Sequence, residues 1–403
     1  MKKRILILHA TAGTGHTRAA EAVAAALRPY PNVDIAVWDA LDYTNGIFKR
    51  LYSKHYIRFV KAFPRAWGYI WETSDSQAPD SWFRQVQHLF NRANSRKLRR
   101  RVLEFAPDLV ICTHYLPLEV LSYLKEQGLT HAPVFGVITD ISAHSFRIMP
   151  NIDRYFAATR ASARELEFKG YPALRITVSG IPVDPIFRDI ESKQIVRERH
   201  GLPPQLPTVL LMSGGFGLGP LPQITQSFAQ ANRPISLVVI AGRSRALKDK
   251  CEKIARRSRA PIKVFGYVDF VHELIDASDI VITKPGGLSS SEILVKGTPM
   301  VLVAPIPGQE QRNCEYLLEN GAAARLYNYD DAAHFIEALL TDTGKLRAMS
   351  AAAQRIAFPD SATMIAATAM EALAAQAREP AALTAHTIEA EKPANISDAP
   401  ARI

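Results

Sequence analysis

Two glycine-rich loops in this sequence each follow an apolar run and lead into a helical pattern, so each could bind an anion. The first lies in HATAGTGHTRAAEAVAAAL, where Gly13 and Gly15 precede His16 at the start of an alanine-rich helix. The second is SGGFGLGP, residues 213–220. Glycine permits a tight turn and close approach of a ligand, and the N–H groups at a helix start carry partial positive charge. A phosphate or a substrate oxygen could therefore bind at either loop.

Both loops also have a purely structural interpretation, in which the glycines turn the chain and His16 caps the helix. The first loop lacks the GxGxxG spacing of a dinucleotide fingerprint. A binding role is favoured because each loop opens one half of the chain. The position of His16 between glycine loop and helix favours its exposure.

A third motif brings polar side chains to two further loops. The stretch DASDIVITKPGGLSSSEILVKGTPMVLVAPIPGQEQRNCEYLLENGAA, residues 276–323, contains a Gly-Gly loop, a helix that carries Glu292, and a loop that ends in Gln309 and Glu310. Acidic and amide groups are suited to binding sugar hydroxyls. Glu292 could instead be an acid near a helix N-terminus that is stabilised by the helix dipole.

These loops sit in a regular alternation of short apolar runs and helical patterns. Continuous apolar runs of this kind are typical of buried parallel strands, and their alternation with helices predicts an α/β fold. The Pro-rich segment GIPVDPIF, residues 180–187, interrupts the alternation, which then restarts near Pro207. We therefore predict two Rossmann-like domains, residues 1–182 and 183–375. The last residues, 376–403, lack aromatic residues and periodicity and are predicted to be a disordered tail.

The composition limits the cellular setting and the partners. The chain has 403 residues, three scattered cysteines and a net charge of +10, which favours a reduced compartment and a polyanionic partner. The first apolar run is too short for a signal peptide, and no run reaches the ~20 apolar residues of a transmembrane helix. We expect a cytoplasmic protein whose contact with a membrane, if any, is peripheral.

Residues 45–105 fit neither α/β alternation and are interpreted as an insertion. They hold thirteen Lys and Arg against four acids, together with three of the four tryptophans. Basic residues attract anionic headgroups and amphipathic aromatic residues settle at the headgroup boundary, so the insertion predicts docking on an anionic membrane surface. The alternatives are nucleic-acid binding, for which no recognised module is present, and a solvated helical insert that is partly core.

Taken together, the three loop motifs resemble glycosyltransferase family 28. HATAGTGHTRAAEA and the pair TKPGGLSSSE and PIPGQEQRN are similar to the diacylglycerol glycosyltransferases, including monogalactosyldiacylglycerol synthases and bacterial processive glucosyltransferases. The resemblance covers residues 4–375. It implies a GT-B fold, in which two Rossmann-like domains face a central cleft.

The resemblance also implies roles for individual residues. Glu292 matches a glutamate that binds the ribose of UDP, and His16 matches a histidine proposed to act as the base, with Asp140 as a second catalytic candidate. The remaining matches lie in loops around the donor, with Val268 framing the uracil, and they are Gly15, Ser213, Gly214, Gly215, Gly286, Gly287, Leu288, Ser289, Gln309 and Glu310.

The implied reaction is an inverting transfer of glucose or galactose from a UDP-sugar to diacylglycerol, at the cytoplasmic face of the membrane. The base takes the acceptor proton while UDP leaves with growing negative charge. No metal, no further cofactor and no nucleic acid are expected. Two alternatives remain: a UDP-sugar 2-epimerase, and a catalytically silent UDP-sugar sensor recruited to membranes. The sequence does not decide between glucose and galactose, or whether further sugars are added.

Overall fold

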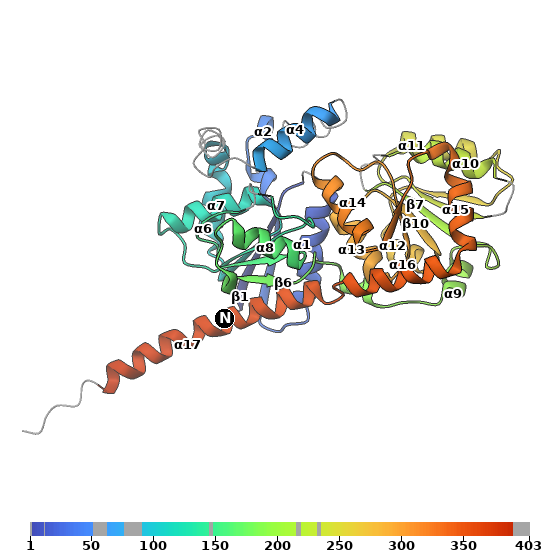
Figure 1. The fold of residues 1–403 in the computed structure, drawn as a ribbon. Coiled ribbons are helices and arrows are strands. Elements are labelled where there is room, and N and C mark those ends of the chain that lie inside the picture. The colour runs from blue at the N-terminus through green and yellow to red at the C-terminus, as the bar shows by residue number, and fades with distance from the viewer. Residues whose placement is uncertain are drawn as a thin grey trace, which may run out of the picture.

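The computed structural model describes residues 2–11, 13–50, 63–75, 91–144, 148–214, 219–231 and 235–389. It contains two domains, each built on a parallel six-stranded sheet (Figure 1). Alternate residues of a strand pack into different clusters: Leu6 and Leu8 lie in one apolar core of the first domain, Ile5 and Ile7 in another. Helices therefore cover both faces of the sheet. The predicted α/β architecture of two domains is confirmed.

The first sheet has the strand order β2-β1-β3-β4-β5-β6. Its strands are β1 Lys3–His9, β2 Val33–Asp39, β3 Leu109–Cys112, β4 Val134–Val137, β5 Arg154–Ala157 and β6 Ile176–Val178. The α-helices of this half are α1 Thr14–Leu27, α2 Gly46–Arg50, α4 Pro64–Asp75, α6 Arg96–Phe105, α7 Tyr115–Glu126 and α8 Arg160–Phe168. Short 3-10 turns are η1 Ala40–Tyr43, η4 Ala173–Arg175 and η5 Pro185–Arg188.

The second sheet has the strand order β12-β11-β10-β7-β8-β9. Its strands are β7 Thr208–Met212, β8 Ser236–Ile240, β9 Ile262–Phe265, β10 Ile280–Thr283, β11 Met300–Leu302 and β12 Ala323–Arg325. The helices are α9 Lys193–Arg199, α10 Leu221–Ala229, α11 Arg245–Ala255, α12 Val271–Asp276, α13 Gly287–Lys296, α14 Gln309–Glu319, η6 Tyr329–Asp331, α15 Ala332–Thr341 and α16 Thr343–Ile356. Sequence patterns missed β12, because its residues Ala-Ala-Arg contain no β-branched or aromatic side chain.

Each sheet has one point at which the order of its strands reverses direction. In the first sheet this point lies between β1 and β3, and in the second between β7 and β10. Loops that follow the strands on either side of such a point leave a crevice between them, which is where open α/β sheets bind ligands. The first glycine loop follows β1 and the second follows β7. Both loops therefore lie at the switch points of their sheets.

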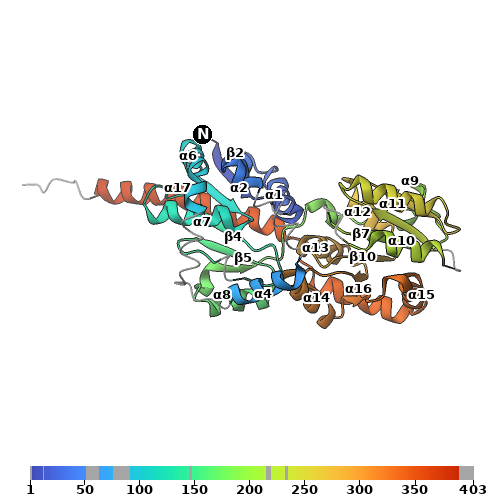
Figure 2. The ribbon, with the colours of Figure 1, turned by 90° about the horizontal axis from the view of Figure 1, so that it is seen from above.

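The C-terminal helix corrects the predicted domain boundaries. Helix α17, Ser361–Glu389, leaves the second domain and runs along the first, as Figures 1 and 2 show. Its residues Ile365, Ala369 and Leu373 are buried in the core that contains Val23 of α1 and Ile5 of β1. The assignment of residues 361–375 to the second domain is thus wrong, because the alanine-rich face of α1 needs an apolar cover that a local pattern does not reveal.

The predicted disorder from residue 376 onward is also wrong in part, since α17 continues to Glu389. The segment is rich in alanine, which has the highest helix propensity. Residues 390–403 lie outside the described part. No helix in the described ranges is both long enough and apolar enough to cross a lipid bilayer.

Helix α4 of the insertion lies against the second domain. The indole of Trp71 is buried against the backbone of Gly308, and the guanidinium of Arg312 lies 4.6 Å from the centroid of a Trp71 ring. His144 Nε2 lies 3.0 Å from the carbonyl oxygen of Trp71. Phe48 is buried as well, so the expectation that the insertion's aromatic residues face a membrane is wrong for Phe48 and Trp71.

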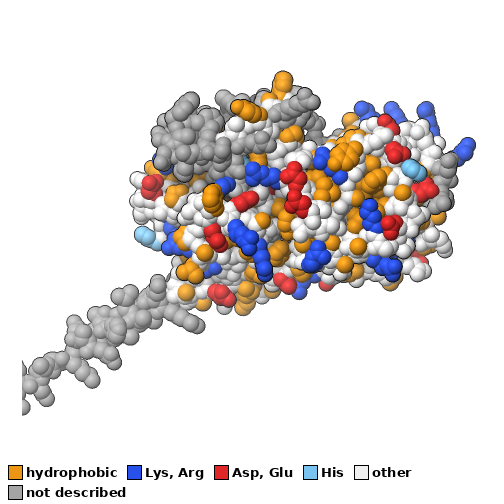
Figure 3. Space-filling view, in the orientation of Figure 1, with side chains coloured by type: hydrophobic (Ala, Val, Ile, Leu, Met, Phe, Trp, Pro, Cys, Tyr) orange, Lys and Arg blue, Asp and Glu red, His pale blue; other side chains and the backbone are white. Residues whose placement is uncertain are grey.

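Other aromatic residues of the insertion do reach the surface. Phe63 is 58% exposed and Tyr69 is 71% exposed. Further aromatic residues of the insertion lie outside the described residues, among them Tyr52, Tyr56, Phe59, Trp82 and Phe83. On the face shown in Figure 3, basic and acidic side chains are interspersed over both domains rather than gathered into one patch.

Candidate active site

His16 lies in the first turn of α1, at the switch point of the first sheet. Its Nδ1 is 2.8 Å from the carbonyl oxygen of Thr113 and 2.9 Å from Oγ1 of Thr139. A carbonyl oxygen only accepts hydrogen bonds, so the contact with Thr113 is favourable when Nδ1 carries the proton. Nε2 is then the unprotonated nitrogen of the neutral ring and can accept a proton. The loops after β3 and β4 thus fix the tautomer that a general base requires.

Asp140 follows Thr139 directly and contacts the other domain. It is buried, and its Oδ1 accepts a hydrogen bond from Nε2 of Gln309. The adjacent N–H of Ile141 donates to Oδ1 of Asn313 over 3.1 Å. The structure therefore joins Asp140, a predicted catalytic residue, to Gln309, a predicted donor contact. Sequence reasoning missed Asn313, which lies four residues after Gln309 on α14.

Glu292 is buried on α13 beside a cation from the first domain. Its Oε1 lies 3.4 Å from Nη2 of Arg18, a residue of α1. Burial raises the pKa of Glu292 to about 7, while the Arg18 charge opposes the rise and the nearby Asp184 charge adds to it. Because Glu292 lies beyond the first turn of α13, the helix-dipole interpretation does not explain it. Sequence reasoning missed Arg18, whose signal was its place two residues after His16.

Glu310 forms an ion pair inside the second domain. Its Oε1 is 3.0 Å from Nζ of Lys284, and its Oε2 accepts the N–H of Ile306 over 2.8 Å. Lys284 is the first residue after β10 and is 8% exposed. Sequence reasoning quoted the motif TKPGG but gave no role to its lysine.

The glycine loop after β7 is described in part. Ser213 is buried at the end of the strand, and Gly214 has φ of 69°, the left-handed region that favours glycine. Gly215 lies outside the described residues. Val268 is half-buried after β9 and packs on the core of the second domain. The predicted contacts of these residues with UDP stay predictions.

The loop at the start of α13 meets the first domain. A Cβ atom placed on Gly287 would lie 2.4 Å from the carbonyl oxygen of Thr139, and Leu288 packs with Ala158 and Ile181. The backbone at Gly15 lies next to Leu288. Gly286 and Ser289 of the same loop are half-buried. Gly287 and Leu288 therefore contribute to the contact between the domains, and their contact with a donor stays a prediction.

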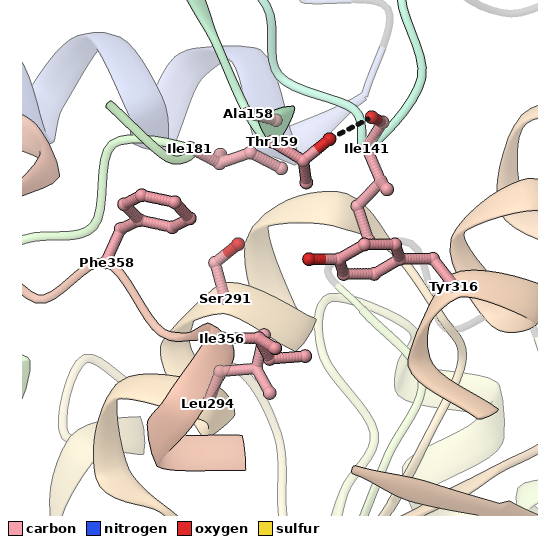
Figure 4. Close-up of a pocket in the computed structure, with 9 residues that line it drawn as sticks. All are labelled: Ile141, Ala158, Thr159, Ile181, Ser291, Leu294, Tyr316, Ile356 and Phe358. Carbon is pink, nitrogen blue, oxygen red and sulfur yellow. Dashed lines mark hydrogen bonds between the residues drawn. The ribbon is translucent and has the colours of Figure 1, made fainter. Parts of the chain in front are cut away.

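A hollow between the domains lies beside this contact (Figure 4). Its lining is largely apolar and consists of Ile141, Ala158, Thr159, Ile181, Ser291, Leu294, Tyr316, Ile356 and Phe358. None of the predicted site residues lines it.

Within the described ranges, no group of three or more His, Cys, Asp and Glu side chains is placed to hold a metal ion.

Comparisons with known proteins identify the family. The sequence model for monogalactosyldiacylglycerol (MGDG) synthase matches residues 16–183, and that for the glycosyltransferase family 28 C-terminal domain matches residues 220–370. A processive diacylglycerol beta-glucosyltransferase of Bacillus cereus is 31% identical over 364 residues, which span 89% of this chain and 91% of the relative. The chain belongs to glycosyltransferase family 28.

Solved structures agree with the GT-B fold of this family 28 protein. MurG of Acinetobacter baumannii superposes with a TM-score of 0.56 at 15% identity, covering 92% of this chain and 99% of MurG. A UDP-GlcNAc 2-epimerase from Neisseria meningitidis, bound to UDP-GlcNAc, superposes with a TM-score of 0.57 at 12% identity, covering 91% and 100%. At such identities the likeness concerns the fold alone, and transferases and epimerases share it.

The raised pKa of Glu292 predicts a specific dependence of stability on pH. Its ordinary value is 4.5, so between about pH 4.5 and 7 the folded state binds a proton that the unfolded state does not. The free energy of unfolding contributed by this group therefore falls as pH rises through that window and is constant above it. We expect the melting temperature of the native protein, minus that of Glu292→Gln, to fall between about pH 5 and 7. The matched control Glu319→Gln, on an exposed position of α14, should show little trend. A difference independent of pH for Glu292→Gln would contradict the prediction.

Proposed function

We propose that this family 28 protein transfers a hexose from a UDP-sugar to diacylglycerol and forms a β-glycosyldiacylglycerol. The proposal is supported by His16, whose Nδ1 contact with the Thr113 carbonyl favours proton acceptance at Nε2, and by Glu292 of the second domain, which pairs with Arg18 on the same helix as His16. The acceptor class follows from the 31% identity to diacylglycerol beta-glucosyltransferases over most of both chains. The donor is UDP-glucose or UDP-galactose.

In the proposed mechanism His16 Nε2 takes the proton of the free hydroxyl of diacylglycerol. The hydroxyl oxygen attacks the anomeric carbon from the face opposite the leaving group, so an α-linked sugar becomes a β-glycoside. The bond between the anomeric carbon and the β-phosphate oxygen breaks, and the electron pair leaves with UDP. The N–H at Nδ1 continues to donate a hydrogen bond to the Thr113 carbonyl oxygen, which holds the imidazolium in place.

Asp140 and Gln309 are proposed to orient the sugar, since their side chains meet at the boundary of the two domains. Glu292 binds the ribose hydroxyls, for which an ionised carboxylate is a strong acceptor. We further propose that the reaction uses no bound metal ion. Helix N-termini and the polar groups after β7 and β10 are the supports for the charge on the leaving UDP.

The test is the product formed by purified protein with diacylglycerol vesicles and either UDP-glucose or UDP-galactose. Thin-layer separation and mass spectrometry should detect a hexosyl-diacylglycerol with one donor, and the yield should survive prior treatment with EDTA. An epimerised UDP-sugar with no glycolipid would favour the epimerase. UDP binding without turnover of either donor would favour the sensor.

Replacing His16 should separate binding from catalysis. His16→Ala removes the proton acceptor, so we expect turnover to fall by about 10²-fold or more, the usual scale of general-base catalysis. UDP affinity, measured by calorimetry, should stay close to that of the native protein. The control His131→Ala changes an exposed histidine in the loop before β4. Near-normal turnover in His16→Ala would remove it as the base.

We propose that the protein docks peripherally on the anionic cytoplasmic face of the membrane through its insertion. Arg96, Lys97, Arg100 and Arg101 of α6 are exposed, and so are Phe63 and Tyr69 earlier in the insertion. Arg100 and Arg101 also pair with Glu104, which reduces the net charge of the helix. Salt weakens attraction of this kind.

A charge-matched pair of variants tests the docking. Replacing Arg96, Lys97, Arg99, Arg100 and Arg101 by glutamine should weaken binding to anionic vesicles at low salt, and the difference should shrink as salt is added. The control replaces five exposed basic residues in and after α11 of the second domain, Lys250, Lys253, Arg256, Arg257 and Arg259. Equal losses in the two variants, measured by vesicle sedimentation, would contradict docking through the insertion.

A further inference from the structure

Lys284 is a buried cation at the switch point of the second sheet. It follows β10 directly, and β10 pairs with β7 at the place where the strand order reverses. Its ammonium group is 3.0 Å from both carboxylate oxygens of Glu310. Burying an unpaired charge costs on the order of several kcal/mol of folding free energy. The chain therefore keeps a paired ammonium at the edge where open α/β sheets bind ligands.

Groups from the glycine loop converge on the same place. A Cβ atom placed on Gly219 would lie 3.1 Å from Cβ of Ser213 and 3.9 Å from Cδ of Lys284. The side chains of Ser213 and Lys284 therefore both lie next to Gly219. Among the described residues, Oγ of Ser213 is buried and has no hydrogen-bond partner. Buried hydroxyl groups are rarely left unpaired, so this oxygen indicates a ligand that completes it.

Lys296, a second buried lysine of this domain, forms an ion pair that serves the fold and can be compared with that of Lys284. Nζ of Lys296 bonds to Oδ2 of Asp276 and to the backbone carbonyl of Asp189. In the described part of the chain, the ammonium of Lys284 has the Glu310 carboxylate as its recorded partner and no carbonyl. An ammonium group has three donors, so Lys284 retains capacity for acceptor oxygens.

We propose that Lys284 binds the diphosphate of the donor and neutralises the charge that develops on UDP as it leaves. When the bond to the anomeric carbon breaks, the electron pair stays on the β-phosphate oxygen, and an N–H of Lys284 donates to that diphosphate. Glu310 holds the ammonium in place, and Ser213 supplies a further hydrogen bond. The inference rests on the proposed function only in requiring a nucleoside diphosphate sugar as donor.

The experiment compares UDP with uridine, which differ by the diphosphate. Lys284→Met should weaken UDP binding by about 10- to 100-fold, the range expected for a charge-assisted hydrogen bond, and change uridine binding less than about twofold. Lys284→Arg keeps the charge and should recover part of the UDP affinity. The control Lys250→Met removes an exposed charge of the same domain and should leave both affinities unchanged. Calorimetry without acceptor measures each affinity.

The outcomes separate this inference from the proposed function. Equal losses of UDP and uridine affinity in Lys284→Met would indicate a structural role and overturn the inference, as would unchanged UDP affinity. If melting shows that Lys284→Met does not fold, Lys284→Gln replaces it, with the same expectations. A native protein that binds neither ligand would overturn the UDP-sugar donor itself. A native protein that binds UDP and makes no glycolipid contradicts only the proposed function.

Discussion

The backbone contact between Gly287 and Thr139 sets how the two domains face each other. Because no side chain stands at Gly287, the start of α13 reaches the carbonyl group of Thr139. Thr139 also contacts His16, and its neighbour Asp140 contacts Gln309. A single close approach therefore brings His16, the proposed base, close to the polar loops of the other domain. A methyl group at this point would separate them, since a Cβ would lie 2.4 Å from the oxygen.

The charges near this contact are paired in a way that a donor can use. Glu292 pairs with Arg18 from the other domain, and Lys284 pairs with Glu310 within its own domain. Buried ions need partners, so each pair limits the cost of burying its two charges. Each pair also contains one group that suits a part of UDP: a carboxylate for ribose hydroxyls and an ammonium for phosphate oxygens. The charge arrangement that stabilises the protein thus also suits the ligand that the proposed function requires.

Helix α17 connects the second domain to the first. It starts in the second domain and buries Ile365 and Leu373 on the first, beside α1. The N–H of Val183 donates to Oγ of Ser361, so the two crossings between the domains are hydrogen-bonded to each other. Helix α1 packs against α17 and carries His16 in its first turn, so the packing of the C-terminal helix helps to position the proposed base.

The sequence by itself determined the motifs and every described strand except β12. Continuous apolar runs predict buried parallel strands because both faces of such sheets are covered, and the glycine loops were correctly placed where strands end and helices begin. The family followed from the same loops and from Glu292, Gln309 and Glu310. These features are local, so a reading of neighbouring residues recovers them.

Only the tertiary structure decided which groups meet. The pairing of Arg18 with Glu292 joins residues 274 positions apart, and that of Asp140 with Gln309 joins residues 169 apart. The burial of Trp71, the strand β12 and the course of α17 likewise depend on a partner surface that lies elsewhere in the chain. Hydrophobic periodicity shows that a face is buried, but it does not show which element covers that face, because the hydrophobic effect is non-directional. The identity of the covering element is set by the packing of the whole chain.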